Sequence, residues 1–143
     1  ASLPYVPGVP TVIFGKHIDK ISIDKEKKIY TLPVVIGEKI ARYTVLAMMI
    51  LPYIFTAYLI VIKFFTPVMG LVLFAIPTFR EIYPALLKPK PDERPADFPD
   101  GQGGWPLYFA PLGFANNRKF GLWFMFGLLV DVALRLIFPT FWI

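Results

Sequence analysis

The stretch ARYTVLAMMILPYIFTAYLIVI, which is residues 41–62, decides the fold class of this chain. It lies between Lys39 and Lys63, and it is long enough to cross the ~30 Å hydrocarbon core of a membrane as a helix. Apolar residues occupy every face of that helix, as expected for a helix surrounded by lipid. Residues 39–63 are therefore predicted to form a transmembrane helix, with a kink at Pro52 near its middle.

Two further stretches have the same character. Residues 67–87 begin with a proline, which is favourable at the first position of a helix, and they stay apolar nearly to their end. Residues 120–138 follow the basic pair Arg118 and Lys119. The sequence therefore predicts an all-α fold, a multi-pass transmembrane helical bundle that forms a single membrane domain over residues 1–143.

The segments between these spans differ from them in composition. Residues 88–104 contain four prolines and three glycines, which predicts an extended aqueous loop. Residues 105–117 are apolar and aromatic but too short to cross, so they are expected to lie in the membrane interface. Residues 1–15 are apolar, carry three prolines and follow no basic segment, unlike a signal peptide. They are predicted to be a partial span, the end of a helix that starts upstream, in a fragment of a longer protein.

Composition excludes several classes of protein. Of the 143 residues, 56% are hydrophobic and only 17% are charged, whereas a soluble domain carries nearer a quarter. The net charge of +5 comes from basic residues clustered at the ends of the apolar spans, which is a topology signal rather than a nucleic-acid footprint. The absence of cysteine excludes disulfides and thiolate sites. A soluble enzyme and a nucleic-acid binder are thus both excluded.

The basic residues also predict the orientation. Residues 16–42, 80–94 and 118–119 hold 13 of the 15 Lys and Arg residues. Positive residues favour the cytoplasmic side, so the loops at 16–38 and 88–104 are expected in the cytoplasm of a protein of the cell (inner) membrane.

Acids, bases and turn formers gather in residues 15–38, GKHIDKISIDKEKKIYTLPVVIGE. Asp19 and Asp24 offer carboxylates, and five lysines surround them. Mg²⁺ held by one or two carboxylates keeps open positions for phosphate oxygens, and lysines add positive charge beside it. This stretch therefore predicts a site for Mg²⁺ and a diphosphate.

Asp24, followed by TLPV at 31–34 and then by Gly37 and Glu38, resembles the second aspartate-rich motif of the UbiA superfamily of intramembrane prenyltransferases, with Asp19 as the first acid of the motif. The two acids of the family are four residues apart, whereas Asp19 and Asp24 are five apart. On an ideal helix, five residues turn two side chains roughly 140° apart. The carboxylates can therefore converge only where the backbone between them is not helical.

The resemblance implies a fold like helices six to nine of such an enzyme, with a polar cavity on the cytoplasmic side. It implies a Mg²⁺-dependent prenyltransferase that moves an isoprenoid chain from a prenyl diphosphate to an aromatic or other lipophilic acceptor. On this resemblance Asp19 and Asp24 are catalytic metal ligands. Lys16, Lys20 and Lys27 would contact the diphosphate.

Two interpretations stay open, because the first aspartate-rich motif of the family does not occur in these 143 residues. Either an N-terminal half supplies it, so that this chain is inactive alone, or the chain is a non-catalytic transmembrane subunit of a larger respiratory or photosynthetic complex. In the second case residues 19–38 are a solvated charged loop between membrane helices, and the partners are membrane lipids and other membrane subunits.

The charged residues within the spans also have alternative interpretations. Arg80 either reaches the membrane surface or faces the same polar cavity as the aspartates. Asp131 and Arg135 are four residues apart and are predicted to pair on one helix face, either as a structural ion pair, which is the favoured interpretation, or as part of a functional site near the far side of the bilayer.

Overall fold

The computed structural model describes residues 2–96 and 105–138 of the chain, and every regular element in that part is a helix. The order is η1 (Leu3–Tyr5), α1 (Gly8–Asp19), α2 (Ile21–Glu26), α3 (Leu32–Ile36), α4 (Glu38–Val61), η2 (Pro67–Ala75), α5 (Ile76–Leu87) and α6 (Phe109–Ile137). The elements η1 and η2 are 3₁₀-helices. The predicted all-α class is confirmed.

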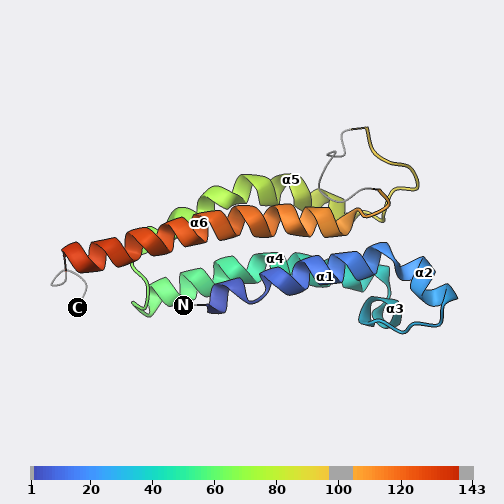
Figure 1. Ribbon diagram of the computed structural model, residues 1–143, viewed down its shortest axis with the longest axis horizontal. Helices are drawn as coiled ribbons and strands as arrows, with labels where there is room; N and C mark the ends of the chain where they lie inside the picture. The colour runs from blue at the N-terminus through green and yellow to red at the C-terminus, as the bar shows by residue number, and fades with distance from the viewer. Residues whose placement is uncertain (1, 97–104, 139–143) are drawn as a thin grey trace.

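The long helices run alongside one another in two layers (Figure 1). One layer contains α1 and α4, and the other contains α5 and α6. The most extensive contact between the layers joins α1 to α6. Residues 16–38, 88–96 and 105–108 gather at one end of the bundle, where α1 ends and α6 begins. We call this the polar end.

Within the described residues, three segments are long and apolar enough to cross a membrane: Glu38–Val61, Pro67–Leu87 and Phe109–Ile137. Less than a third of the most apolar part of each is buried inside the bundle. Large apolar side chains such as Val61, Leu129 and Leu136 are exposed instead. Unpartnered apolar surface on this scale is typical of lipid contact, so the chain is a multi-pass membrane protein.

The apolar interior consists of two clusters. Buried residues of the cluster nearer the polar end are Ile18, Ala41, Val45, Met49, Ile82, Leu86 and Phe109. Those of the other cluster are Leu59, Phe65, Met69, Val72, Ala75, Phe120 and Phe124. Both clusters join residues from distant parts of the chain, which holds the helices together as one unit.

The last helix differs from the sequence-based expectation. Residues 105–117 were expected to form an interfacial segment separate from a span at 120–138, but α6 begins at Phe109 and continues without a break to Ile137. Pro111 does not interrupt it because a proline in the first turn removes no intrahelical hydrogen bond. At about 1.5 Å per residue the 29 residues extend about 43 Å, which exceeds the ~30 Å hydrocarbon core. The first turns of α6 can therefore lie in the interface while the rest crosses.

The expected loop at 16–38 is also more ordered than expected. It holds the end of α1 together with α2 and α3, and the backbone leaves helical geometry at Lys20, which separates α1 from α2. The sequence required such a break if the two aspartates were to converge. Of the expected loop at 88–104, residues 97–104 lie outside the described part of the chain.

The second span is not a single α-helix. Pro67–Ala75 is a 3₁₀-helix, and the α-helical hydrogen-bonding pattern starts only at Ile76. A 3₁₀ run of nine residues is uncommon, since its hydrogen bonds are poorer than those of an α-helix. The amide of Thr66, directly before this run, donates to the Asp131 carboxylate at 2.7 Å.

Asp131 and Arg135 form the predicted ion pair, with 3.1 Å between Arg135 Nε and Asp131 Oδ2. Arg135 also donates from Nη2 to the carbonyl of Phe64 at 2.7 Å. The pair therefore fastens the turn after α4 to the C-terminal part of α6, which is a structural role.

Candidate functional site at the polar end

Asp19 is the last residue of α1, and its buried side chain caps the start of α6. Oδ1 accepts a hydrogen bond from the amide of Phe109, and Oδ2 accepts one from the amide of Ala110, both at 3.0 Å. The first amides of a helix have no intrahelical partner and carry partial positive charge, so a carboxylate stabilises them. Asp19 thus acts as a helix cap supplied from a distant part of the chain.

Burial raises the pKa of the Asp19 carboxyl above its ordinary value of 3.8, because desolvation disfavours the charged form. Hydrogen bonds from the amides of Phe109, Ala110 and Tyr108 and the charge of Lys90 act in the opposite direction. Desolvation is the largest of these effects.

Lys90 connects the segments that meet near Asp19 at the polar end. Its Nζ donates to the carbonyl of Asp19 at 3.5 Å and to the carbonyl of Pro106, and it lies 5.2 Å from the centre of the Trp105 ring. Its amide donates to Glu38 Oε1 at 3.4 Å. A cation over an indole face is favourable, so Lys90 joins α1, α4 and the segment before α6. No local sequence pattern predicts this role of Lys90, because its partners lie fifteen or more positions away in the chain.

Asp24 has different neighbours. Its Oδ2 lies 3.8 Å from Nδ1 of His17 and accepts a hydrogen bond from Thr31 Oγ1 at 3.4 Å. Its own carbonyl accepts the amide of Ile29 at 2.8 Å. Asp24 therefore organises the turn from α2 to α3, whereas Asp19 holds α6.

The carboxylates described here do not by themselves fit a Mg²⁺ site. Both oxygens of Asp19 already accept backbone amides, and Asp24 is engaged by Thr31 and His17. In residues 2–96 and 105–138 no three Asp, Glu or His side chains come together as a metal site would require. Mg²⁺ binding at Asp19 and Asp24 thus stays a prediction that would need ligands from outside the described residues.

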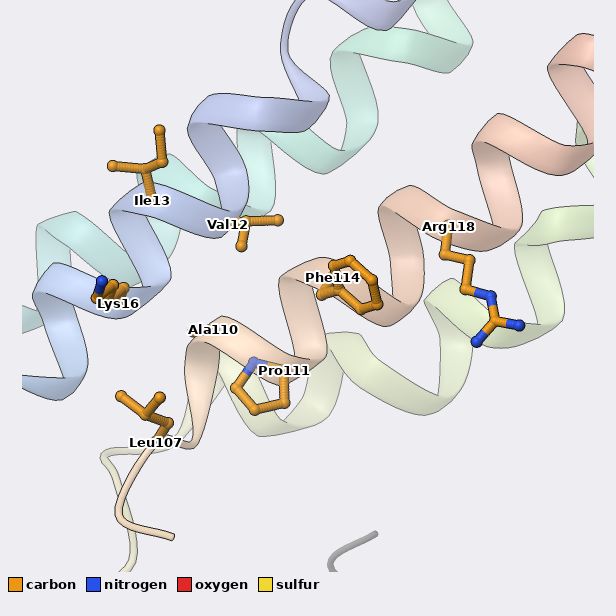
Figure 2. Close-up of a pocket in the computed structure, with 8 residues that line it drawn as sticks. All are labelled: Val12, Ile13, Lys16, Leu107, Ala110, Pro111, Phe114 and Arg118. Atoms are coloured by element: carbon orange, nitrogen blue, oxygen red, sulfur yellow. The ribbon is translucent and has the colours of Figure 1, made fainter. Parts of the chain in front are cut away.

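Beside the Asp19 cap, a groove of about 630 Å³ lies between α1 and α6. Figure 2 shows its walls, which are mostly apolar, with Lys16 and Arg118 toward opposite ends. The lining residues are Val12, Ile13, Lys16, Leu107, Ala110, Pro111, Phe114 and Arg118. Ala110 belongs both to the groove and to the Asp19 cap, so the two features are adjacent. An apolar groove with cations fits an anionic amphiphile.

The other predicted site residues are distributed more widely. Lys20 and Lys27 are exposed at the polar end, outside the groove that contains Lys16. Arg80 is exposed on α5, and among the described residues its side chain makes no hydrogen bond or ion pair. Arg118, which sequence reasoning used only as a topology signal, is the groove residue that it missed. Its place at one end of the groove became visible only with the helix packing.

Comparisons with protein-family models, with curated proteins and with solved structures found no match to this chain.

Proposed function

We propose that this chain forms the isoprenoid-binding part of a Mg²⁺-dependent intramembrane prenyltransferase that uses a prenyl diphosphate and a lipophilic acceptor. The observation that carries the proposal is the groove between α1 and α6, whose apolar walls suit an isoprenoid chain and whose cation nearer the polar end, Lys16, suits its diphosphate. The resemblance of residues 19–38 to the second aspartate-rich motif supports the same function. The finer fold assignment, to helices six to nine of a UbiA-type enzyme, belongs to this proposal.

In this proposal the residues have separate tasks. Lys16, at the end of the groove nearer the polar end, binds the anionic end of the donor, and Lys20 and Lys27 raise the positive potential there. Asp24 contributes one carboxylate to a Mg²⁺ site whose other ligands come from beyond the described residues. Asp19 positions the first turn of α6, which lines the groove.

Binding of farnesyl diphosphate to the intact protein in lipid nanodiscs tests the groove, with farnesol as the uncharged control. We expect Lys16→Gln to weaken diphosphate binding about fivefold, the effect of about 1 kcal/mol for a partly solvated charge, and to leave farnesol binding unchanged. Arg118→Gln, at the opposite end of the groove, should weaken diphosphate binding less. Lys39→Gln is a matched control, because Lys39 is exposed but does not line the groove. Equal affinities in all three variants would contradict the assignment.

Turnover tests the enzyme itself. Asp24→Asn in the intact protein should abolish prenyl transfer in the presence of Mg²⁺, and undiminished transfer would rule out the proposed site.

The commitment of both Asp19 oxygens to α6 favours a second candidate, a non-catalytic transmembrane subunit of a larger membrane complex. On that alternative the chain copurifies stoichiometrically with other membrane proteins, and Asp24→Asn changes no activity.

A further inference from the structure

Several apolar side chains are exposed within residues 16–38, although the many charged residues of this segment predict an aqueous loop. Ile29, Tyr30, Leu32 and Val35, in the turn before α3 and in α3 itself, are exposed, Tyr30 by 78% and Val35 by 67%. Unlike the exposed residues of α4, η2, α5 and α6, they do not belong to a candidate membrane span. Their surface therefore needs a partner of its own.

The position of α3 indicates its depth. It ends at Ile36, and Gly37, with φ of +83°, reverses the chain into α4 at Glu38. The two helices pack against each other, and α3 lies beside the start of α4 at the polar end (Figure 1). Because α4 is a candidate span that begins at Glu38, α3 lies at the level where the chain enters the membrane.

Positively charged residues lie on either side of this apolar surface, as suits contact with an anionic membrane surface. Lys25, Lys27 and Lys28 precede it and are all exposed, with Glu26 as the one acid among them. Lys39 follows it and is exposed as well. Exposed lysines that flank exposed apolar residues are typical of segments that lie in the interface of an anionic membrane.

We propose that residues 29–36 form an interfacial anchor: their apolar side chains enter the boundary between headgroups and acyl chains, and Lys25, Lys27 and Lys28 bind anionic lipid headgroups. The anchor is independent of any catalytic role. It fixes the height of the polar end, and with it the α1–α6 groove, relative to the bilayer surface.

Spin labelling tests the depth directly, because the 143 residues contain no cysteine and one added cysteine marks one position. A nitroxide at Leu32→Cys or Val35→Cys, in the intact protein in nanodiscs, is compared with labels at Leu129→Cys and Asp92→Cys. We expect the α3 labels to collide more with oxygen than with water-soluble nickel chelate, as the Leu129 label should. The Asp92 label should show the reverse.

Two results would overturn the anchor. Preferential collision with the nickel chelate at both α3 positions would place the segment in water. Low collision with both reagents would mean that another protein segment covers it.

A second experiment varies the charge of the lipids. Moving from phosphatidylcholine nanodiscs to nanodiscs that also contain phosphatidylglycerol should at least double the ratio of oxygen to nickel collisions at Val35→Cys. The change should disappear when Lys25, Lys27 and Lys28 are all replaced by Gln. A ratio that does not depend on lipid charge in the parent protein would refute headgroup binding by the lysines.

Discussion

Asp19 combines two properties that oppose each other. Its carboxylate is buried, which disfavours the charged form, yet it accepts two amides at the start of α6, which favours that form. The net result is a raised pKa, so the desolvation penalty exceeds the gain from the hydrogen bonds. The same carboxylate cannot be fully committed to a helix cap and freely available to a metal ion. The protonation state of Asp19 is therefore the property of this residue to measure.

The raised pKa of Asp19 predicts how stability depends on pH. Above pH 3.8 the folded protein holds a proton that the unfolded chain releases, so the free energy of unfolding falls as pH rises through the window up to the folded-state pKa. Above that window the contribution is constant. We expect the difference in unfolding free energy between the parent and Asp19→Asn to decrease as pH rises from about 4, measured by denaturation in detergent micelles. A difference that increases over this range would mean that the pKa is lowered.

At the scale of elements, the contact between α1 and α6 depends on glycine. A Cβ at Gly15 would lie 2.9 Å from the backbone of Phe109, closer than real contacts allow. A Cβ at Gly113 would lie 3.3 Å from Thr11. Small residues let two membrane helices approach closely and gain packing energy. This approach brings Asp19 within reach of the α6 amides.

Replacing Gly15 by alanine should therefore destabilise the fold. The added methyl group has to push α1 away from the backbone of α6, at a cost of about 1–3 kcal/mol. Unfolding titrations in mixed micelles measure this loss. Gly70→Ala is the matched control, because a Cβ there meets no atom within 4 Å, and it should change stability by less than about 1 kcal/mol. Equal stabilities of the two variants would show that the close approach is not required.

Sequence patterns predicted the elements better than their ends. The apolar spans at 39–63 and 67–87 correspond closely to Glu38–Val61 and Pro67–Leu87, because length and hydropathy are local properties. The predicted start of the last span was wrong because residues 105–117 were judged too short to cross by themselves, whereas in the structure residues 109–117 continue directly into the following apolar stretch. The 3₁₀ conformation of Pro67–Ala75 was not predicted either, since its apolar composition is equally compatible with an α-helix.

Side-chain contacts between residues close in the sequence were likewise easier to predict than contacts between distant residues. The pair of Asp131 and Arg135 was predictable because four residues separate them on one helix. The amides that bind Asp19 belong to residues about ninety positions later in the chain, and no spacing rule relates the two. Arg118 likewise joined Lys16 at the groove only through the packing of α6 on α1. Partners that are far apart in the sequence could therefore be identified only from the three-dimensional fold.

On the scale of the whole molecule, charge separates the two ends of the bundle. Most basic residues lie in or near the polar end, while the turn that contains Lys63 lies at the opposite end (Figure 1). The positive-inside rule therefore predicts that the polar end, with Asp19 and Asp24, faces the cytoplasm.

Cysteine accessibility tests this orientation. Asp92→Cys should react with a membrane-impermeant maleimide in inverted membrane vesicles but not in intact spheroplasts, and Lys63→Cys should react in spheroplasts only. Both residues are exposed, so neither outcome is limited by burial within the protein. The opposite labelling pattern would reverse the orientation and remove the proposed groove from the cytoplasmic substrate pool.

The two buried aspartates on and beside α6 also limit how the molecule can move. Asp19 holds the first amides of α6, and Asp131, near its other end, holds the amide of Thr66. Sliding α6 along its axis by one residue, about 1.5 Å, would lengthen hydrogen bonds at both places simultaneously. Translation of this helix along its axis is therefore opposed at two points, one near each of its ends. A conformational change of the bundle that keeps both contacts has to leave the axial position of α6 unchanged.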